Sequence, residues 1–356
     1  MVDGIVIAAE IDGTVLGLDA QTGARVWTHA LGDALHTGGT YLTAAPAIDD
    51  GEVFIGNEQA FVALEAATGE PSWLTPLAPL EPDFSTDAPV AIGGGLVVGT
   101  FSRGTGFSAW DRDTGDRIWT EASAADFGVS GSPLISDDTV YVVAAADEVI
   151  ALDLVDGATR WKQKLDPAPN SWSYAVAGGP ALADGVLVVP TLYGALVGLD
   201  ASSGTERWRH TAAPSILRTT HYQGAGVAGF EGSPVIADGI VWAADTTGLL
   251  VALDLHSGAQ LWQYPLGAPV LAGLAVADGW LVAATYDGTI HTLSVPLVAR
   301  TDDRGGCCDT GRGGRGGVLL AAMVGLVLRR RRRASERATY GAQSPGAVAY
   351  RRAAQR

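Results

Sequence analysis

Short runs of apolar residues alternate with clusters of Gly, Asp, Ser and Thr along the chain as far as about residue 295. The runs are rich in Val, Ile, Leu and Ala, and short apolar runs bounded by turn residues predict β-strands. Asp-Gly pairs join neighbouring runs, as within residues 45–57 and 178–190. Because Gly accepts the positive φ that a tight turn needs, these pairs predict hairpins.

One pattern recurs in six segments, with an apolar run, an acidic residue, a Thr, Ser or Asp before Gly, and a Trp four residues after that Gly. The segments are residues 16–27, 62–73, 108–119, 150–161, 197–208 and 251–262. Their tryptophans are Trp27, Trp73, Trp119, Trp161, Trp208 and Trp262, and their glycines are Gly23, Gly69, Gly115, Gly157, Gly204 and Gly258. The tryptophans lie 42 to 54 residues apart. Because a four-stranded propeller blade takes about 40–50 residues, this period predicts a β-propeller.

The apolar runs give seven visible blades, of which the first and the last are incomplete. The chain begins at a second strand, and residues 289–295 form a third strand with no Trp motif after it. Open ends would expose sheet edges, so we expect roughly 20 or more upstream residues and a signal peptide, and an eighth blade is compatible with the pattern. Tight turns should share one face, and the longer connections between blades should lie on the opposite, binding face.

Composition and charge agree with an all-β body followed by a different kind of segment. Glycine is frequent, with 47 residues, and only 17% of residues are charged. Residues 1–299 contain ten basic and 35 acidic residues, a net charge of −25, whereas residues 300–356 contain 13 basic and 4 acidic residues, a net charge of +9. A body this acidic repels phosphate backbones, which argues against nucleic acid as a partner.

The six Trp segments resemble the pyrroloquinoline-quinone-like (PQQ-like) repeat family, whose [AL]xDxxTGxxxW signature covers residues 2–295. The resemblance implies that each repeat Trp packs between neighbouring blades and that each repeat Gly closes the turn before it. Burial of a large aromatic side chain at every junction explains the repetition. We therefore interpret these residues as structural.

The same repeat also holds a quinone and a calcium ion in quinoprotein dehydrogenases, which is one alternative function. Those enzymes resemble one another in a longer, eight-bladed chain with an adjacent-cysteine disulfide over the cofactor, whereas Cys307 and Cys308 here follow the last blade. Asp111, Asp113 and Asp116 imitate a calcium loop without its glycine spacing or terminal Glu. We therefore expect no catalytic residues, no PQQ, no calcium and no other metal site.

Two longer connections, within residues 166–177 and 211–231, fall on the expected binding face. Their candidate contact residues are Trp172, Tyr174, Arg218, His221, Tyr222 and Glu231. Exposed aromatic and Arg side chains often dominate protein interfaces, although ordinary loop packing is the alternative interpretation.

The propeller comprises residues 1–298, and the chain after it divides into three parts. These are a Gly/Arg-rich linker with the Cys pair (299–315), a hydrophobic segment with an Arg cluster (316–333) and a tail expected to be disordered (334–356). The arrangement resembles the myxobacterial C-terminal sorting signal, which implies processing and lipid attachment at Cys307 or Cys308. The 13-residue apolar run, 316–328, is shorter than the roughly 17–25 residues of a membrane-spanning helix. A low-complexity end without function is the alternative.

Arg329–Arg333 should stay cytoplasmic while the tail is in the inner membrane, which places the propeller outside the cytoplasm. The sequence thus predicts an exported, non-catalytic propeller at the outer membrane or cell surface that binds an envelope protein or another ligand. It resembles in role the scaffold lipoprotein of the outer-membrane barrel assembly machinery. The alternatives are a quinone-dependent dehydrogenase and a sensory or polysaccharide-binding module.

Overall fold

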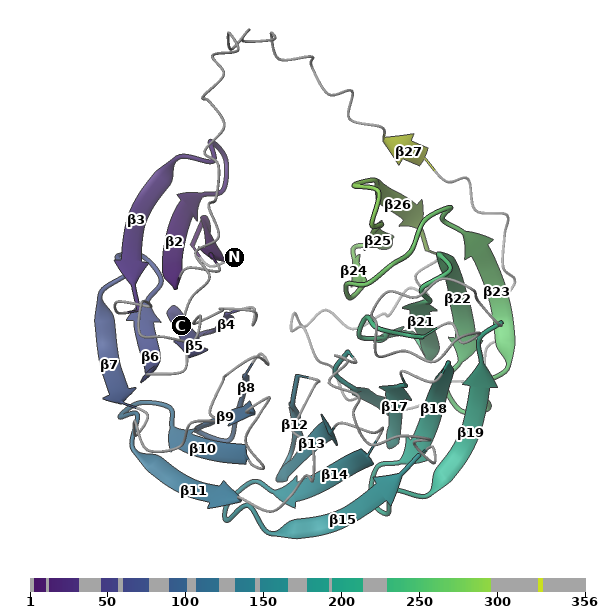
Figure 1. The fold of residues 1–356 in the computed structure, drawn as a ribbon, viewed down its shortest axis with the longest axis horizontal. Coiled ribbons are helices and arrows are strands. Elements are labelled where there is room, and N and C mark those ends of the chain that lie inside the picture. Colours follow the sequence, from purple (N-terminus) through teal and green to yellow (C-terminus); the bar gives the residue numbers. More distant parts are fainter. Residues whose placement is uncertain are drawn as a thin grey trace, which may run out of the picture.

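The structure, a computed structural model, describes residues 3–10, 13–31, 46–56, 60–76, 90–100, 107–121, 132–144, 148–165, 178–191, 194–213, 229–295 and 326–328. In these residues the regular elements are β-strands, and 27 of them form seven sheets. The sheets stand side by side around a common centre (Figure 1). The predicted all-β propeller fold is confirmed.

Strands follow one another from the centre of the ring outward in chain order (Figure 1). The innermost strands are β4 (Ala47–Asp49), β8 (Ala91–Gly93), β12 (Leu134–Ser136), β16 (Ala181–Ala183), β20 (Val235–Ala237) and β24 (Ala275–Ala277). The second strands are β1 (Ile5–Ala9), β5 (Glu52–Gly56), β9 (Leu96–Thr100), β13 (Thr139–Ala144), β17 (Val186–Pro190), β21 (Ile240–Ala244) and β25 (Trp280–Ala284). The third strands are β2 (Thr14–Asp19), β6 (Ala60–Glu65), β10 (Phe107–Asp111), β14 (Glu148–Asp153), β18 (Ala195–Asp200), β22 (Leu249–Asp254) and β26 (Ile290–Ser294). The outermost strands are β3 (Arg25–Ala30), β7 (Pro71–Pro76), β11 (Arg117–Glu121), β15 (Thr159–Lys164), β19 (Glu206–Thr211), β23 (Gln260–Pro265) and β27 (Leu326–Leu328).

The first and last blades depart from the four-stranded plan in different ways. Blade one has three described strands, β1 to β3, as the sequence predicted. Blade seven was predicted to lack its fourth strand, but β27 pairs antiparallel with β26, opposite Ile290–Thr292. This strand comes from the apolar run of the tail. Leu-Val-Leu can occupy an open sheet edge without the Trp motif that marked the other fourth strands.

Blades two to six each have tight turns at two places, after the first and after the third strand. In blade five, Asp184 and Gly185 form the first turn with φ angles of 47° and 70°. Two successive positive φ angles are what a two-residue hairpin of matching twist requires, and Asp and Gly are among the residues that tolerate them. The second turn closes where Gly204, at φ 72°, donates its N–H to the carbonyl of Asp200 over 2.8 Å.

The core lies between the blades rather than within any one of them. Six clusters of buried residues occupy the junctions between successive blades, within the described residues. In the interior blades both faces of a strand are covered, as in β17, where all five residues are buried. In blade seven only one face is covered, and Trp280 at the start of β25 is 50% exposed. Packing against neighbouring blades therefore stabilises each sheet.

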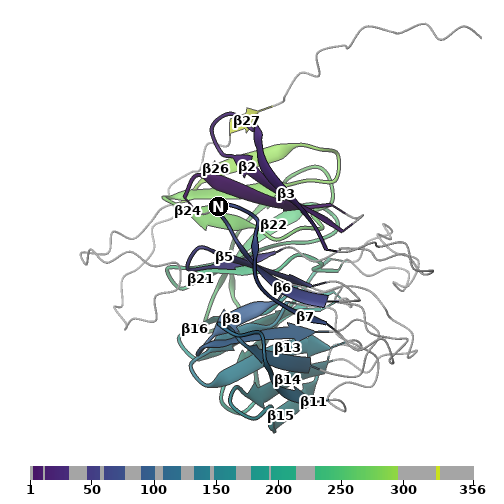
Figure 2. The same cartoon turned by 90° about the vertical axis from the view of Figure 1, so that its left-hand side faces the viewer.

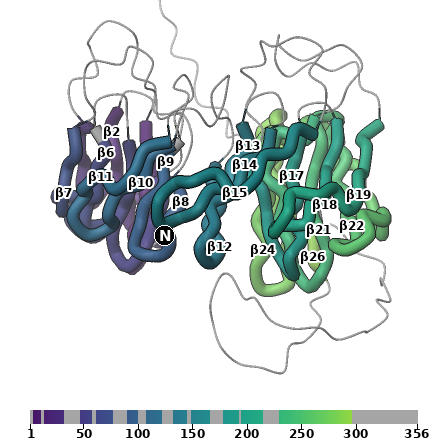
Figure 3. Tube along the Cα trace, turned by 90° about the horizontal axis from the view of Figure 1, so that it is seen from below, coloured from purple at the N-terminus to yellow at the C-terminus, as the bar shows by residue number. Residues whose placement is uncertain are grey.

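The strands run between the two flat faces of the disc (Figures 2 and 3). Because successive strands of blades two to six are antiparallel, both tight turns of each of these blades lie on the same face, as in blade five. We call it the turn face; it carries residues 136–139, 183–186 and 200–205, for example. The opposite face carries the connections from one blade to the next.

Candidate binding groove between the fourth and fifth blades

The repeat tryptophans of blades one to five each form the same kind of hydrogen bond with the next blade. The indole Nε1 donates to the carbonyl of the residue that follows the acidic residue of the next repeat, over 2.8–3.1 Å. The pairs are Trp27–Ala66, Trp73–Arg112, Trp119–Leu154, Trp161–Ala201 and Trp208–Leu255. Trp262 lies in the corresponding place in blade six, where its ring stacks on Tyr264.

The repeat glycines leave room for these rings. Gly69, Gly115, Gly157, Gly204 and Gly258 lie against the Trp of the preceding blade, so that a Cβ would fall 2.4–2.6 Å from its ring carbons. Gly23, in blade one, has no such neighbour among the described residues. A side chain at these positions would both clash with the ring and strain a backbone of positive φ.

Burial of the tryptophans alternates from blade to blade. Trp27, Trp119 and Trp208, in blades one, three and five, are 7–9% exposed, whereas Trp73, Trp161 and Trp262 are only half-buried. Each half-buried Trp has an aromatic companion in register on the second strand of its own blade, at 6.0–6.1 Å between ring centroids. The pairs are Phe54–Trp73, Tyr141–Trp161 and Trp242–Trp262. The second ring fills the junction, so part of the Trp remains accessible.

At the junction of blades four and five this arrangement opens a groove of about 670 Å³ on the turn face. We call it the Trp161 groove. Its apolar wall contains Tyr141, Trp161, Leu134 and Leu182. Its charged rim contains Asp137, Asp138, Arg160, Asp184, Asp200 and Arg207. The size falls within the usual range of ligand sites, about 300–1,000 Å³.

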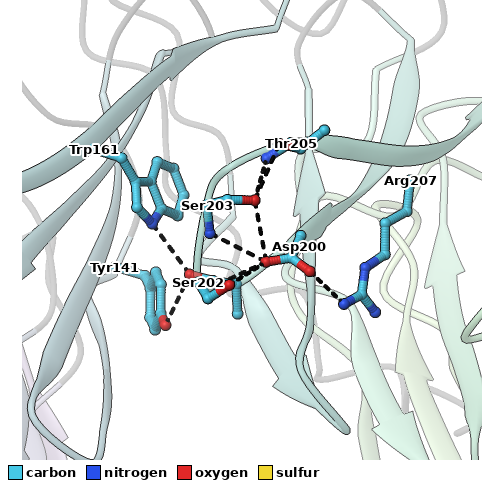
Figure 4. Close-up of polar contacts among 8 residues, drawn as sticks. Tyr141, Trp161, Asp200, Ser202, Ser203, Thr205 and Arg207 are labelled. Atoms are coloured by element: carbon cyan, nitrogen blue, oxygen red, sulfur yellow. Dashed lines mark hydrogen bonds and ion pairs between the residues drawn. The ribbon is translucent and has the colours of Figure 1, made fainter.

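Both aromatic rings of the groove are held by one carbonyl group, as Figure 4 shows. Trp161 Nε1 donates to the carbonyl of Ala201 over 3.1 Å, and the Tyr141 hydroxyl donates to the same oxygen over 3.2 Å. Burial raises the pKa of the Tyr141 hydroxyl. It therefore stays a neutral donor, and the two rings are fixed before any ligand arrives.

The two arginines of the rim are occupied by carboxylates. Arg160 contacts Asp138 at 2.8 Å and Asp153 at 2.7 Å, and Arg207 contacts Asp200 at 2.5 Å. The hydrogen bond from Arg160, followed by that from Thr139, lowers the pKa of Asp138 to about 2. Hydrogen bonds from Ser202 and then Arg207 hold the pKa of Asp200 far below its usual value. These carboxylates are ionised at any ordinary pH.

Asp137 and Asp184 complete the rim from the first turns of blades four and five. Both are exposed and have positive φ angles, 52° and 47°. Neither forms an ion pair with a described residue. With four aspartates and two already paired arginines, the groove presents net negative charge to a ligand.

Among the residues that sequence analysis singled out for contact, only Glu231 belongs to the part of the chain that the structure describes. Glu231, half-buried beside Phe230, precedes the inner strand of blade six. The other five contact residues, together with Cys307 and Cys308, lie outside the described residues. The described connections of that face give no test of the predicted binding site.

The Trp161 groove itself was missed, although the sequence contains a signal for it. Arg precedes the repeat Trp only in the fourth and fifth units, as Arg160 and Arg207, whereas other units have Val, Ser, Ile or Leu there. A groove depends on two blades at once. A search for motifs inside single repeats therefore could not locate it.

The residues that imitate a calcium loop belong to an ordinary turn. Asp111 Oδ1 accepts the N–H groups of Asp113 and Thr114 over 3.0 and 2.9 Å. These bonds, with that of Thr114 largest, lower the pKa of Asp111. Over the part of the chain that the structure describes, no three His, Cys, Asp or Glu side chains gather to hold a metal. The same part contains no helix with the length and apolar character needed to cross a membrane.

Seven sheets, the repeated TGxxxW turn and the indole-to-carbonyl junctions define a β-propeller built from PQQ-like repeats. The family model described as "Outer membrane protein assembly factor BamB" matches residues 1–121, 77–243 and 218–296. The chain belongs to this family.

Individual relatives carry the same description. The BamB protein of Xanthomonas campestris is 28% identical over 92% of this chain and 77% of its own length. The BamB proteins of Moranella endobia and Yersinia pestis are 24% and 27% identical over 68% and 74% of this chain. The matched regions span 63% and 55% of those two relatives, so this chain corresponds to part of their length.

Solved structures with the same fold include proteins of different function. BamB from Moraxella catarrhalis has a TM-score of 0.53 and 20% identity, covering 82% of this chain and 94% of that one. A europium-containing methanol dehydrogenase has a TM-score of 0.64 and 16% identity, covering 83% of this chain and 72% of that one. Identities this low show the fold alone, and the fold does not decide between scaffold and enzyme.

Proposed function

We propose that this protein is a non-catalytic scaffold of the cell envelope that binds another protein during outer membrane protein assembly. The observation that carries the proposal is the family match, which extends through residues 1–296. The Trp161 groove adds a physical means, because it offers preorganised aromatic and charged side chains on a rigid pair of blades. Rigid sites of this kind bind with a small loss of conformational entropy.

A role in assembly predicts a specific defect in the organism that makes the protein. Removal of the gene should lower the amount of folded β-barrel proteins in the outer membrane, measured from the heat-dependent migration of these barrels on gels. Expression of the full chain should restore that amount. Unchanged levels of folded barrels without the protein would contradict the assembly role.

The rival function is a quinone-dependent dehydrogenase, because a methanol dehydrogenase has a similar fold. Against it, Asp111 Oδ1 accepts N–H groups of its own turn, and in the described part of the chain no three His, Cys, Asp or Glu side chains gather. Purified protein mixed with PQQ, Ca²⁺ and a primary alcohol should therefore not reduce an acceptor dye. Alcohol-dependent dye reduction that requires both additives would replace the scaffold proposal with an enzyme.

The tail supports the proposed location outside the cytoplasm. We propose that residues 299–315 link the propeller to a sorting segment, residues 316–333, and that Cys307 or Cys308 carries a lipid anchor. The mass of the protein isolated from its host's membranes should then show a lipid increment and loss of the residues after the Cys pair, which include strand β27 of blade seven. An unmodified tail on the mature protein would contradict this anchoring.

A further inference from the structure

The Trp161 groove differs from the neighbouring junctions in its accessible aromatic surface. In the junctions before and after it, Trp119 and Trp208 are 8% and 7% exposed. At the groove, Trp161 is half-buried, because Tyr141 occupies the inner part of the junction. Leu134 and Leu182 add half-buried aliphatic surface to the same wall. A partly accessible indole between two rigid sheets is a favourable contact for a large apolar or aromatic side chain.

The charge that the groove leaves available is negative. Arg160 and Arg207 already contact carboxylates at 2.5–2.8 Å, so their charges are compensated within the protein. Asp137 and Asp184 have no ion-pair partner among the described residues and stand on the turns of two different blades. A ligand that brings a cation to this rim gains attraction, whereas an anionic ligand is repelled.

Hydrogen bonds within the protein already hold the aromatic and charged side chains of the groove in place. Ala201 fixes both aromatic rings through its carbonyl, and Asp200 holds Arg207 while accepting hydrogen bonds from Ser202 and Ser203 (Figure 4). Side chains that are already ordered lose little conformational entropy on binding. A short segment with few contacts can therefore bind measurably.

We infer that the Trp161 groove binds a partner protein segment in which a large apolar side chain is flanked by Lys or Arg. This inference rests on the proposed scaffold function and specifies the chemistry of its partner. The apolar side chain contacts Trp161 and Tyr141, and the flanking cations lie against Asp184 and Asp137 on either side. The volume of about 670 Å³ accommodates a few side chains rather than a folded domain.

Three synthetic twelve-residue peptides test the two parts of this recognition. They share a Gly/Ser background and differ at the centre, which is Arg-Phe-Arg, Glu-Phe-Glu or Arg-Gly-Arg. Calorimetric titration into the full-length protein should show binding of the Arg-Phe-Arg peptide and at least about tenfold weaker binding of the others, since each lacks one required contact. Equal binding of the three peptides, or no binding of Arg-Phe-Arg, would overturn the inference.

A matched pair of turn variants assigns the site. Asp184→Asn removes a charge at the groove, and Asp238→Asn makes the same change in the first turn of blade six, where φ is 51° instead of 47°. Asn tolerates this left-handed backbone, so both variants should fold. Asp184→Asn should weaken Arg-Phe-Arg binding about 2- to 5-fold, as expected for a solvent-exposed charge pair. Asp238→Asn should leave it unchanged, and equal effects of the two variants would refute the groove as the site.

The double variant Asp137→Asn with Asp184→Asn separates this inference from the proposed function. In the host lacking the gene, a double variant that no longer binds the peptide should also fail to restore folded barrels. Full restoration by that variant would overturn the inference that the assembly partner uses the groove, while leaving the scaffold role intact. Normal barrel levels in the gene deletion itself would instead refute the scaffold role, even if the peptide binds as expected.

Discussion

The alternating burial of the repeat tryptophans predicts that one substitution has different costs at neighbouring junctions. Trp208→Phe and Trp161→Phe each remove an indole N–H and part of a ring. Trp208 is 7% exposed and donates over 2.8 Å to the carbonyl of Leu255, a residue with no exposed surface. Trp161 is half-buried, and its acceptor, the Ala201 carbonyl, also accepts a bond from Tyr141.

The magnitudes follow from what each variant leaves behind. Trp208→Phe deprives a buried carbonyl of its indole donor, at a cost of about 1–3 kcal/mol. The smaller ring leaves a void that adds about 1 kcal/mol, for a total loss of about 2–4 kcal/mol in the free energy of unfolding. Trp161→Phe leaves Ala201 with Tyr141 as a donor and opens onto solvent, so we expect a loss of about 1 kcal/mol.

Urea unfolding, followed by circular dichroism, measures the two losses under identical conditions. The transition midpoints should shift by clearly different amounts while the dependence on urea concentration stays the same. Equal losses, or a larger loss for Trp161→Phe, would show that Tyr141 does not lessen the contribution of Trp161 to stability. The explanation of the half-buried tryptophans would then be wrong.

Two further predictions concern the turns and the ion pairs around the groove. Gly185→Ala should lower the free energy of unfolding by about 1 kcal/mol, because it strains a positive φ. Gly204→Ala should lower it by about 1–3 kcal/mol more, because the new Cβ would lie 2.6 Å from the Trp161 ring. Thermal or urea unfolding compares the two variants, and equal losses would contradict the close packing. Because the folded state lowers the pKa of Asp138 to about 2, its contribution to stability is present above the ordinary carboxyl value and is lost as pH falls from about 4 to about 2. Arg160→Gln should raise that pKa towards about 3.9, measured by NMR titration, and an unchanged pKa would show that Arg160 is not its main cause.

Much of the fold could be predicted because the same turn and Trp motifs recur in successive repeats. The Asp-Gly turns and the TGxxxW motif recur in register with the strands, so each copy supports the interpretation of the others. β27 could not be predicted in this way, because Leu326–Leu328 carries none of the motif and lies among residues with a different composition.

The candidate site was harder to predict because it belongs to a junction. The groove depends on Tyr141 from a second strand, Arg160 from a fourth strand and Asp184 from the next blade. These residues are up to 43 positions apart, and each is ordinary within its own repeat. In hindsight, aromatic residues in the second strands of alternate repeats indicate which junctions leave their Trp accessible.

The junction hydrogen bonds all run in one direction along the chain, and this has a consequence for synthesis. Each indole donates to a carbonyl that lies 35 to 47 residues later in the sequence. At a ribosomal rate of about 5–20 residues per second, every newly made Trp waits about 2–9 seconds for its acceptor to emerge. The growing end of the nascent propeller therefore always presents one large, unsatisfied aromatic surface, which only the next blade removes.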